Sequence, residues 1–178
     1  MQRINWFPDP NITGTAKPVA GNNVRIDYPV VNHRNWLRAT STATGNNYAQ
    51  YTLSGAQIPP AGTYRVRASA YAQKTGAAFV VFAHVGDSYS ELYRVPVGDG
   101  QTVTVNGTIT IPSNTDQLLI RIELGQKTVG VTGMMSDILI ERADTYDTAI
   151  GGGGGFRASS QETPCHSVNA AHRAGGAR

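Results

Sequence analysis

The chain has a single cysteine, Cys165, among its 178 residues. One cysteine cannot form a disulfide within the chain, so we expect the fold to be independent of an oxidising compartment. No apolar run approaches the roughly 20 residues of a membrane-spanning helix. The opening MQRINWF is too short and too polar to be a signal peptide. These absences predict a chain with no membrane insertion and no signal peptide.

Charged residues are also scarce. They make up 15% of the chain, well below the roughly 25% of an average domain. The formal net charge is +3, and the arginines are spread along the sequence. A dense basic run of the kind found in nucleic-acid-binding proteins is missing, so we expect no nucleic-acid partner. The low charge favours an all-β domain of extracellular or virion type over a helical cytosolic enzyme.

Catalytic motifs are missing as well. The acidic residues are scattered without a triad or paired-carboxylate pattern, and no glycine-rich phosphate-binding loop occurs. His33 and His84 have no evident partner in the sequence. Cys165 lies in a tail segment without a base to activate it. We therefore predict that the protein is not an enzyme and uses no catalytic cofactor.

Alternation of apolar and polar residues runs through most of the first 143 residues. In GTYRVRASAYAQ (62–73) every second residue from Tyr64 to Ala70 is apolar, and Arg65 to Tyr71 alternate with them. This period of two is typical of a half-buried antiparallel strand. Further strands are predicted over 23–31, 35–42, 46–53, 77–85, 90–98, 101–112, 117–125 and 134–143. About nine strands separated by turn clusters predict an all-β fold, a two-sheet antiparallel β-sandwich of the jelly-roll type.

The composition changes after Asp144. The stretch TYDTAIGGGGGF contains five consecutive glycines, which hold a strand only at an entropic cost. The residues that follow have no periodic apolar pattern, and no helix is predicted anywhere. We therefore expect a sandwich domain over 1–143, a glycine-rich linker over 144–155 and an irregular, extended or disordered C-terminal arm over 156–178.

Three segments carry a resemblance to a known family. They are NWFPDPN near the start, PPAGTYRVRASAY in the middle, and SDILIERAD shortly before the glycine run. In this order they resemble the jelly-roll domains of phage minor tail proteins, particularly those of actinobacterial phages, which are similar to carbohydrate-binding modules. The resemblance covers residues 1–155. Such domains usually close with a Tyr-Phe-Asp-Gly-like run, and TYDTAIGGGGGF departs from it.

The resemblance implies a non-enzymatic virion structural protein, assembled in the host cytoplasm, with a host-attachment or particle-stabilising role. Its expected partners are other virion proteins, further copies of the chain in a homo-oligomer, and a host cell-surface glycan. Two alternatives stay open: a capsid decoration protein, and a free carbohydrate-binding module of a glycan-degrading system. The resemblance also implies that NWFPDP forms the first edge strand, with Trp6 or Phe7 closing the sandwich end. In the arm, Phe156, Arg157, Arg173 and Arg178 are the expected assembly contacts.

Glycan recognition needs flat aromatic rings for sugar faces and planar polar groups for hydroxyls. The candidates are Tyr71, Arg65, Arg67, Trp36, Tyr89 and Tyr93. Tyr71 and the two arginines share one face of a predicted strand. A structural alternative is that Tyr71 covers its strand while the arginines pair with Glu123 or Glu91 across the sheet.

Metal binding has a weaker basis in the sequence. Jelly-roll modules of this type often hold a structural calcium ion, and Asp9 and Asp137 are the candidate oxygen ligands. Calcium takes six to eight oxygens, of which the sequence supplies two. Cys165, His166 and His172 form an incomplete set for zinc, which takes four ligands.

Overall fold

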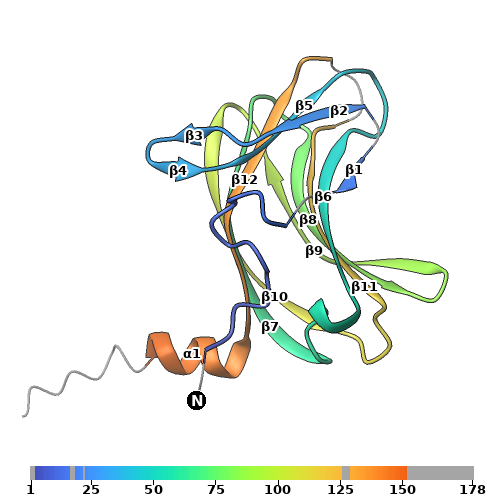
Figure 1. Ribbon diagram of the computed structural model, residues 1–178, viewed down its shortest axis with the longest axis vertical. Helices are drawn as coiled ribbons and strands as arrows, with labels where there is room; N and C mark the ends of the chain where they lie inside the picture. Colours follow the sequence, from blue (N-terminus) through green and yellow to red (C-terminus); the bar gives the residue numbers. More distant parts are fainter. Residues whose placement is uncertain (1–2, 17–18, 22, 126–128, 152–178) are drawn as a thin grey trace, which may run out of the picture.

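The computed structural model describes residues 3–16, 19–21, 23–125 and 129–151. Within them, two five-stranded antiparallel sheets pack as a sandwich (Figure 1). Sheet A contains, in spatial order, β1 (Val19–Ala20), β6 (Tyr48–Ser54), β11 (Gln117–Glu123), β8 (Ala77–Val85) and β9 (Ser88–Val97). Sheet B contains β10 (Gln101–Ile111), β7 (Gly62–Ala72), β12 (Thr132–Arg142), β5 (Leu37–Ser41) and β2 (Val24–Asp27). A hairpin of β3 (Val30–Val31) and β4 (Arg34–Asn35), a 3-10 turn at Gly55–Gln57 and helix α1 (Ala143–Gly151) complete the fold.

The predicted all-β sandwich is confirmed. Nine of the described strands have four residues or more, in agreement with the expected number. From β5 to β12 the chain crosses to the other sheet at every step except β8 to β9, which is the connectivity of a jelly roll. No helix in the described part of the chain is long and apolar enough to cross a bilayer.

The core lies between the inner faces of the two sheets. In β7 every second residue from Tyr64 to Ala72 is buried, and the residues between them line the outer face, as the alternation predicted. Apolar inner faces of β6, β8, β11 and β12 supply the opposing and neighbouring side chains. The period of two therefore decides which side chains of each strand remain available on the surface.

The N-terminal segment 3–16 differs from the expected edge strand. It has no strand structure, but it does close the sandwich: Phe7 is 1% exposed and its ring meets that of Tyr51 edge-on, 4.8 Å between centroids. The segment runs beside the second half of β12, where the amide of Trp6 donates to the carbonyl of Ile140 at 2.9 Å. Beyond Met135, β12 has no pairing with β5, so this segment takes the place of a neighbouring strand.

Helix α1 falls where the sequence predicted a linker from residue 144, so that prediction was wrong for 144–151. The Asp144 carboxylate accepts from the amide of Thr145 at 2.8 Å, and the Thr148 hydroxyl donates to the carbonyl of Asp144 at 2.6 Å. A helix of nine residues is marginal in isolation, and contacts with sheet B supply the rest of its stability. The remaining linker residues 152–155 and the predicted arm, with Phe156, Arg157, Arg173 and Arg178, lie outside the described residues.

Candidate functional site

Two elements project from the outer face of sheet B. The β3–β4 hairpin lies over one end of this face and helix α1 lies at the other (Figure 1). Between them the outward side chains of β7, β10 and β12 form a floor, in which Tyr71 lies between Thr102 and Met134. Two cavities follow one another along this floor and share Arg34. We call the pair the sheet B groove, and its halves the hairpin cavity and the helix cavity.

The hairpin cavity has a volume of about 460 Å³. Its lining consists of Val31, Asn32, Arg34, Trp36, Tyr71, Thr102 and Met134. Two aromatic rings and a thioether thus lie beside an amide, a hydroxyl and a guanidinium. Small-molecule sites commonly combine an apolar lining with a few polar groups in this way.

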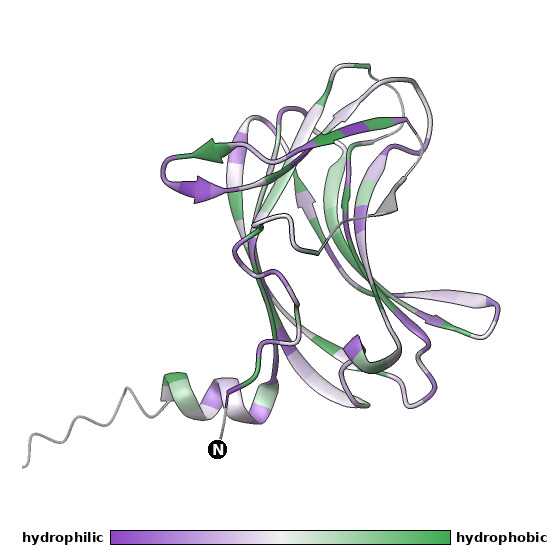
Figure 2. Ribbon diagram, viewed as in Figure 1, coloured by the Kyte–Doolittle hydropathy of each residue, from purple (hydrophilic) through white to green (hydrophobic). Residues whose placement is uncertain are grey.

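The hairpin that walls this cavity is held in a tight two-residue turn. Asn32 and His33 both have positive φ angles, 51° and 60°, as a type I′ turn requires. Asparagine and histidine are both among the non-glycine residues that are enriched in this conformation. Figure 2 shows the neighbouring strand β3 as strongly apolar, and Val30 in it is 67% exposed. The hairpin therefore presents an exposed apolar edge directly beside the cavity.

Arg34 fixes the hairpin to the sheet and separates the two cavities. Its Nε pairs with Oδ2 of Asp137 at 3.0 Å, and its NH1 donates to the hydroxyl of Ser69 at 2.9 Å. Its guanidinium also lies 5.7 Å from the ring centroid of Trp36. Asp137 lies in a register shift of β12 between Ser136 and Leu139, where it adopts a φ of 51°.

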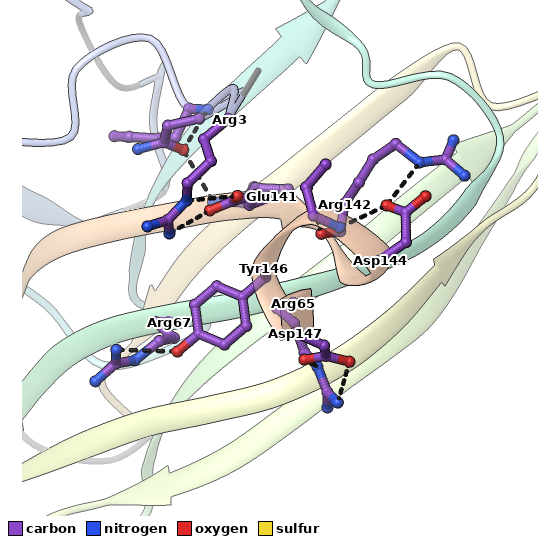
Figure 3. A network of polar contacts seen from close by, with 12 residues as sticks. Arg3, Arg65, Arg67, Glu141, Arg142, Asp144, Tyr146 and Asp147 are labelled. Atoms are coloured by element: carbon purple, nitrogen blue, oxygen red, sulfur yellow. Dashed lines mark hydrogen bonds and ion pairs between the residues drawn. The ribbon is translucent and has the colours of Figure 1, made fainter. Parts of the chain in front are cut away.

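The helix cavity has a volume of about 470 Å³. It is lined by Arg3, Arg34, Arg67, Ala68, Ser69, Thr104, Asp137, Leu139 and Tyr146. The polar network around it is shown in Figure 3: Arg67 donates to the Tyr146 hydroxyl at 3.0 Å, and Arg3 binds Glu141 through two hydrogen bonds of 2.8 and 2.7 Å. Glu141 is almost fully buried, so the Arg3 contact supplies the counter-charge that a buried carboxylate needs.

Arg65 anchors helix α1 just outside the groove. Its Nε and NH2 donate to the two carboxylate oxygens of Asp147 at 2.9 and 2.8 Å (Figure 3). The hydrogen bond from Arg65 lowers the pKa of Asp147 below its usual value. This ion pair holds the helix against β7 and keeps the Tyr146 hydroxyl within hydrogen-bond distance of Arg67.

The predicted glycan-binding residues divide into two groups. Trp36, Tyr71 and Arg67 line the groove, and Arg65 stands beside it. Tyr89 and Tyr93 belong to β9 of sheet A: Tyr89 is 60% exposed beside His84, and Tyr93 lies inward over Gly107. The structure therefore does not bring these two tyrosines to the other candidates.

The β7 arginines do not form the ion pairs with Glu91 or Glu123 that the sequence suggested. Arg65 pairs with Asp147 and Arg67 contacts Tyr146, both in α1, whereas Glu91 and Glu123 pair with Arg94 on the outer face of sheet A. The sequence did not identify Arg3, Asn32, Arg34, Met134 or Tyr146 as groove residues. They come from four separate segments, and only the strand order brings them together.

A further hollow, of about 350 Å³, lies on the outer face of sheet A. It contains Tyr48, Phe82 and Tyr89, but Arg121 lies between the first two rings, 3.9 Å from the centroid of Tyr48 and 4.8 Å from that of Phe82. The guanidinium also donates twice to the Gln50 side chain, at 3.0 and 2.7 Å. Arg121 therefore covers the Tyr48 and Phe82 ring faces, and Tyr89 is the ring of this hollow that it leaves uncovered.

The structure gives the calcium hypothesis no support. Asp9 is buried, and its carboxylate accepts hydrogen bonds from the amides of Thr13, Gly14 and Thr15 at 2.8 to 3.1 Å. Burial raises the pKa of Asp9, but hydrogen bonds from the amide and hydroxyl of Thr13 and from the amides of Gly14 and Ala16 outweigh it, so the pKa is lowered overall. Asp137 is paired with Arg34. Among the described residues no three His, Cys, Asp or Glu side chains form a group that could hold a metal ion; Cys165, His166 and His172 lie outside them.

Comparisons with known proteins agree with this architecture. No protein-family model matches the sequence, and no curated protein is similar to it. Among solved structures, the C-terminal family 22 carbohydrate binding module of Clostridium thermocellum Xyn10B aligns with a TM-score of 0.60 at 15% identity, covering 81% of this chain and 93% of the module. The CBM22-1 xylan-binding domain from Paenibacillus barcinonensis Xyn10C aligns with a TM-score of 0.58 at 13% identity, covering 79% and 92%.

A third similar structure is TmCBM61 in complex with β-1,4-galactotriose, with a TM-score of 0.51 at 16% identity, covering 78% of this chain and 99% of that one. At these identities the likeness concerns the fold and leaves the ligand open. The phage-tail part of the sequence resemblance is not tested by these three structures. The chain therefore has the jelly-roll fold of carbohydrate-binding modules.

Proposed function

We propose that the protein is a non-catalytic glycan-binding domain whose ligand lies in the sheet B groove. The observation that carries this proposal is the hairpin cavity, in which Trp36, Tyr71 and Met134 lie beside Asn32 and Thr102. A pyranose ring has an apolar face suited to aromatic side chains and equatorial hydroxyls suited to amide and hydroxyl partners. The groove continues past Arg34, so a chain of several sugars can extend from one cavity into the next.

The similar structures support a glycan-binding role. Two are described as a carbohydrate binding module and a xylan-binding domain, and a third is a complex with β-1,4-galactotriose. They support a binding role over a catalytic one, and they suggest neutral β-linked oligosaccharides as first probes.

We further propose that the domain belongs to a phage virion, as a minor tail protein that contacts a glycan of the host surface. The support is the sequence resemblance of the three segments at the start, middle and end of the sandwich. On this proposal the protein assembles in the host cytoplasm, its partners are other virion proteins and further copies of itself, and its place is the virion. A capsid decoration protein and a free carbohydrate-binding module are the alternatives.

Calorimetric titration with xylohexaose and β-1,4-galactotriose tests the glycan-binding proposal. Tyr71→Ala is the test variant, and Tyr89→Ala is its matched control on the opposite sheet. We expect Tyr71→Ala to weaken binding at least tenfold and Tyr89→Ala to leave it unchanged. Loss of binding in the Tyr89 variant alone would place the site on sheet A and refute the assignment.

Light scattering of the full chain and of a chain ending at Gly151 tests the virion proposal. The shorter chain keeps α1 and so keeps the groove intact. A discrete oligomer that dissociates on truncation would support a particle component held together by the C-terminal arm. A monomer in both forms, together with glycan binding, would favour a free carbohydrate-binding module.

A further inference from the structure

The helix cavity differs in charge from the hairpin cavity. Three arginines line it, Arg3, Arg34 and Arg67, together with a single acidic residue, Asp137. Arg3 is already paired with Glu141 and Arg34 with Asp137. Among the residues that the structure describes, Arg67 has no acidic partner, and its one hydrogen bond goes to the neutral Tyr146 hydroxyl. The cavity therefore has one positive charge that the surrounding side chains do not neutralise.

The groups around Arg67 are suited to an anion. The Tyr146 oxygen accepts from Arg67, which leaves the phenolic proton free to donate to a ligand. Thr104 of β10 lines the same cavity opposite Ser69 of β7 and presents a further hydroxyl. The Ser69 hydroxyl is already engaged, since it accepts from Arg34 at 2.9 Å and donates to the Asp137 carboxylate at 3.5 Å. A guanidinium with adjacent hydroxyl donors matches the planar oxygens of a carboxylate or the oxygens of a phosphate.

The Arg67 side chain is exposed, and both its backbone and its hydrogen-bond partner Tyr146 are held in position. Its strand β7 is central in sheet B, paired with β10 on one side and β12 on the other. The neighbouring Arg65–Asp147 pair holds α1 against the sheet and keeps Tyr146 in place (Figure 3). Preorganised donors lose less freedom when they bind a ligand.

We propose that the helix cavity is an anionic subsite, so that the preferred ligand is a glycan carrying a carboxylate or phosphate group next to a neutral sugar that occupies the hairpin cavity. This inference rests on the proposed glycan-binding function and names the chemical class of its ligand. Arg67 and the Tyr146 hydroxyl bind the anionic group, while Tyr71 contacts the neutral ring and the nearly buried Trp36 forms part of the wall beside it. Arg34 lies between the hairpin cavity and the helix cavity and lines both.

Two matched pairs of probes test the subsite and separate its two chemical sources. Xylohexaose is compared with the same oligomer carrying a glucuronic acid branch, and mannopentaose is compared with mannopentaose phosphate. We expect the acidic member of at least one pair to bind about tenfold tighter at low salt, as one new charge-assisted contact provides, and the difference to shrink as salt is raised. The pair that shows the effect identifies the anion as carboxylate or phosphate.

Arg67→Gln is the decisive variant and Arg25→Gln its control. Arg25 is an exposed residue of β2 in the same sheet and lines neither cavity, so its replacement removes the same charge elsewhere. Arg67→Gln should abolish the preference for the acidic probe, and Arg25→Gln should retain it. If both variants lose the preference equally, it arises from long-range electrostatic attraction between the protein and the acidic probe, and the anionic subsite is refuted.

The outcomes also separate this inference from the proposed function. If acidic and neutral probes bind equally and Tyr71→Ala weakens both, the groove binds glycans and the anionic subsite is wrong. NMR of the arginine Nε–H signals, titrated with glucuronate and mannose 6-phosphate, gives an independent readout. A shift of the Arg67 signal without binding of any oligosaccharide would support the anion site and refute the glycan-binding function. If the Arg67 signal does not shift and no oligosaccharide binds, both proposals are refuted.

Discussion

Replacement of Phe7 by alanine is the most direct test of how the N-terminal segment is held. Phe7 is 1% exposed, and its ring packs edge-on against the ring of Tyr51. Truncation of a buried phenylalanine costs about 3–5 kcal/mol, of which the aromatic pair accounts for about 0.5–1.5 kcal/mol. Since a domain's whole free energy of unfolding is about 5–15 kcal/mol, this single change should remove a large part of it.

The assay is chemical unfolding followed by tryptophan fluorescence, with calorimetry for the melting temperature. For a domain of this size the loss corresponds to a fall in Tm of roughly 6–20 °C, at about 2–4 °C per kcal/mol. Ile4→Ala is the matched control, because Ile4 is in the same segment but is 48% exposed; it should change the free energy of unfolding by less than about 0.5 kcal/mol. A Phe7→Ala variant within about 1 kcal/mol of the parent protein would show that the segment does not close the core, and would refute the reasoning.

Three further predictions concern other parts of the fold. The pKa of Asp9 is lower in the folded state than in the unfolded chain, so its ionised carboxylate stabilises the folded state at neutral pH. The free energy of unfolding should therefore fall as the pH drops below about 4, the pKa of an aspartate in the unfolded chain. Asp9→Asn should make acid unfolding, followed by circular dichroism, less dependent on pH. Gly107→Ala should cost about 1–3 kcal/mol in urea unfolding, because a Cβ there would lie 2.2 Å from the Tyr93 ring, and adding Tyr93→Leu should recover part of the loss. Asp147→Asn should speed hydrogen exchange in α1 while leaving the Tm nearly unchanged, because it removes an exposed ion pair; unchanged exchange would show that the Arg65 contact does not hold the helix.

The strands were predictable because their signal is local. In β7 the inward and outward side chains follow directly from the alternation, and predicted bounds of 62–73 became Gly62–Ala72. Helix α1 was missed because aspartate and threonine favour helices only weakly and because its stabilising partners, Arg65 and Arg67, are about 80 residues away in sequence.

The candidate site was predictable only in part. Tyr71 and Arg67 were placed on one face correctly, since residues of one strand separated by an even number of positions share a face. Tyr89 and Tyr93 were grouped with them by residue type, and the strand order puts β9 in the other sheet. The hydrogen bonds of Asp9 were not predicted, because most of its partners in 13–15 are backbone amides, which residue identities do not reveal.

By itself the sequence determined the all-β class and the faces of the strands. These properties depend on side-chain periodicity and on the cost of exposing apolar surface, which any short window of sequence carries. Only the tertiary structure decided that a hairpin and a helix flank the outer face of sheet B, and that Arg67 has no acidic partner among the described residues. Such features arise from contacts between segments far apart in the chain, because strand order and a register shift in β12 set which side chains meet.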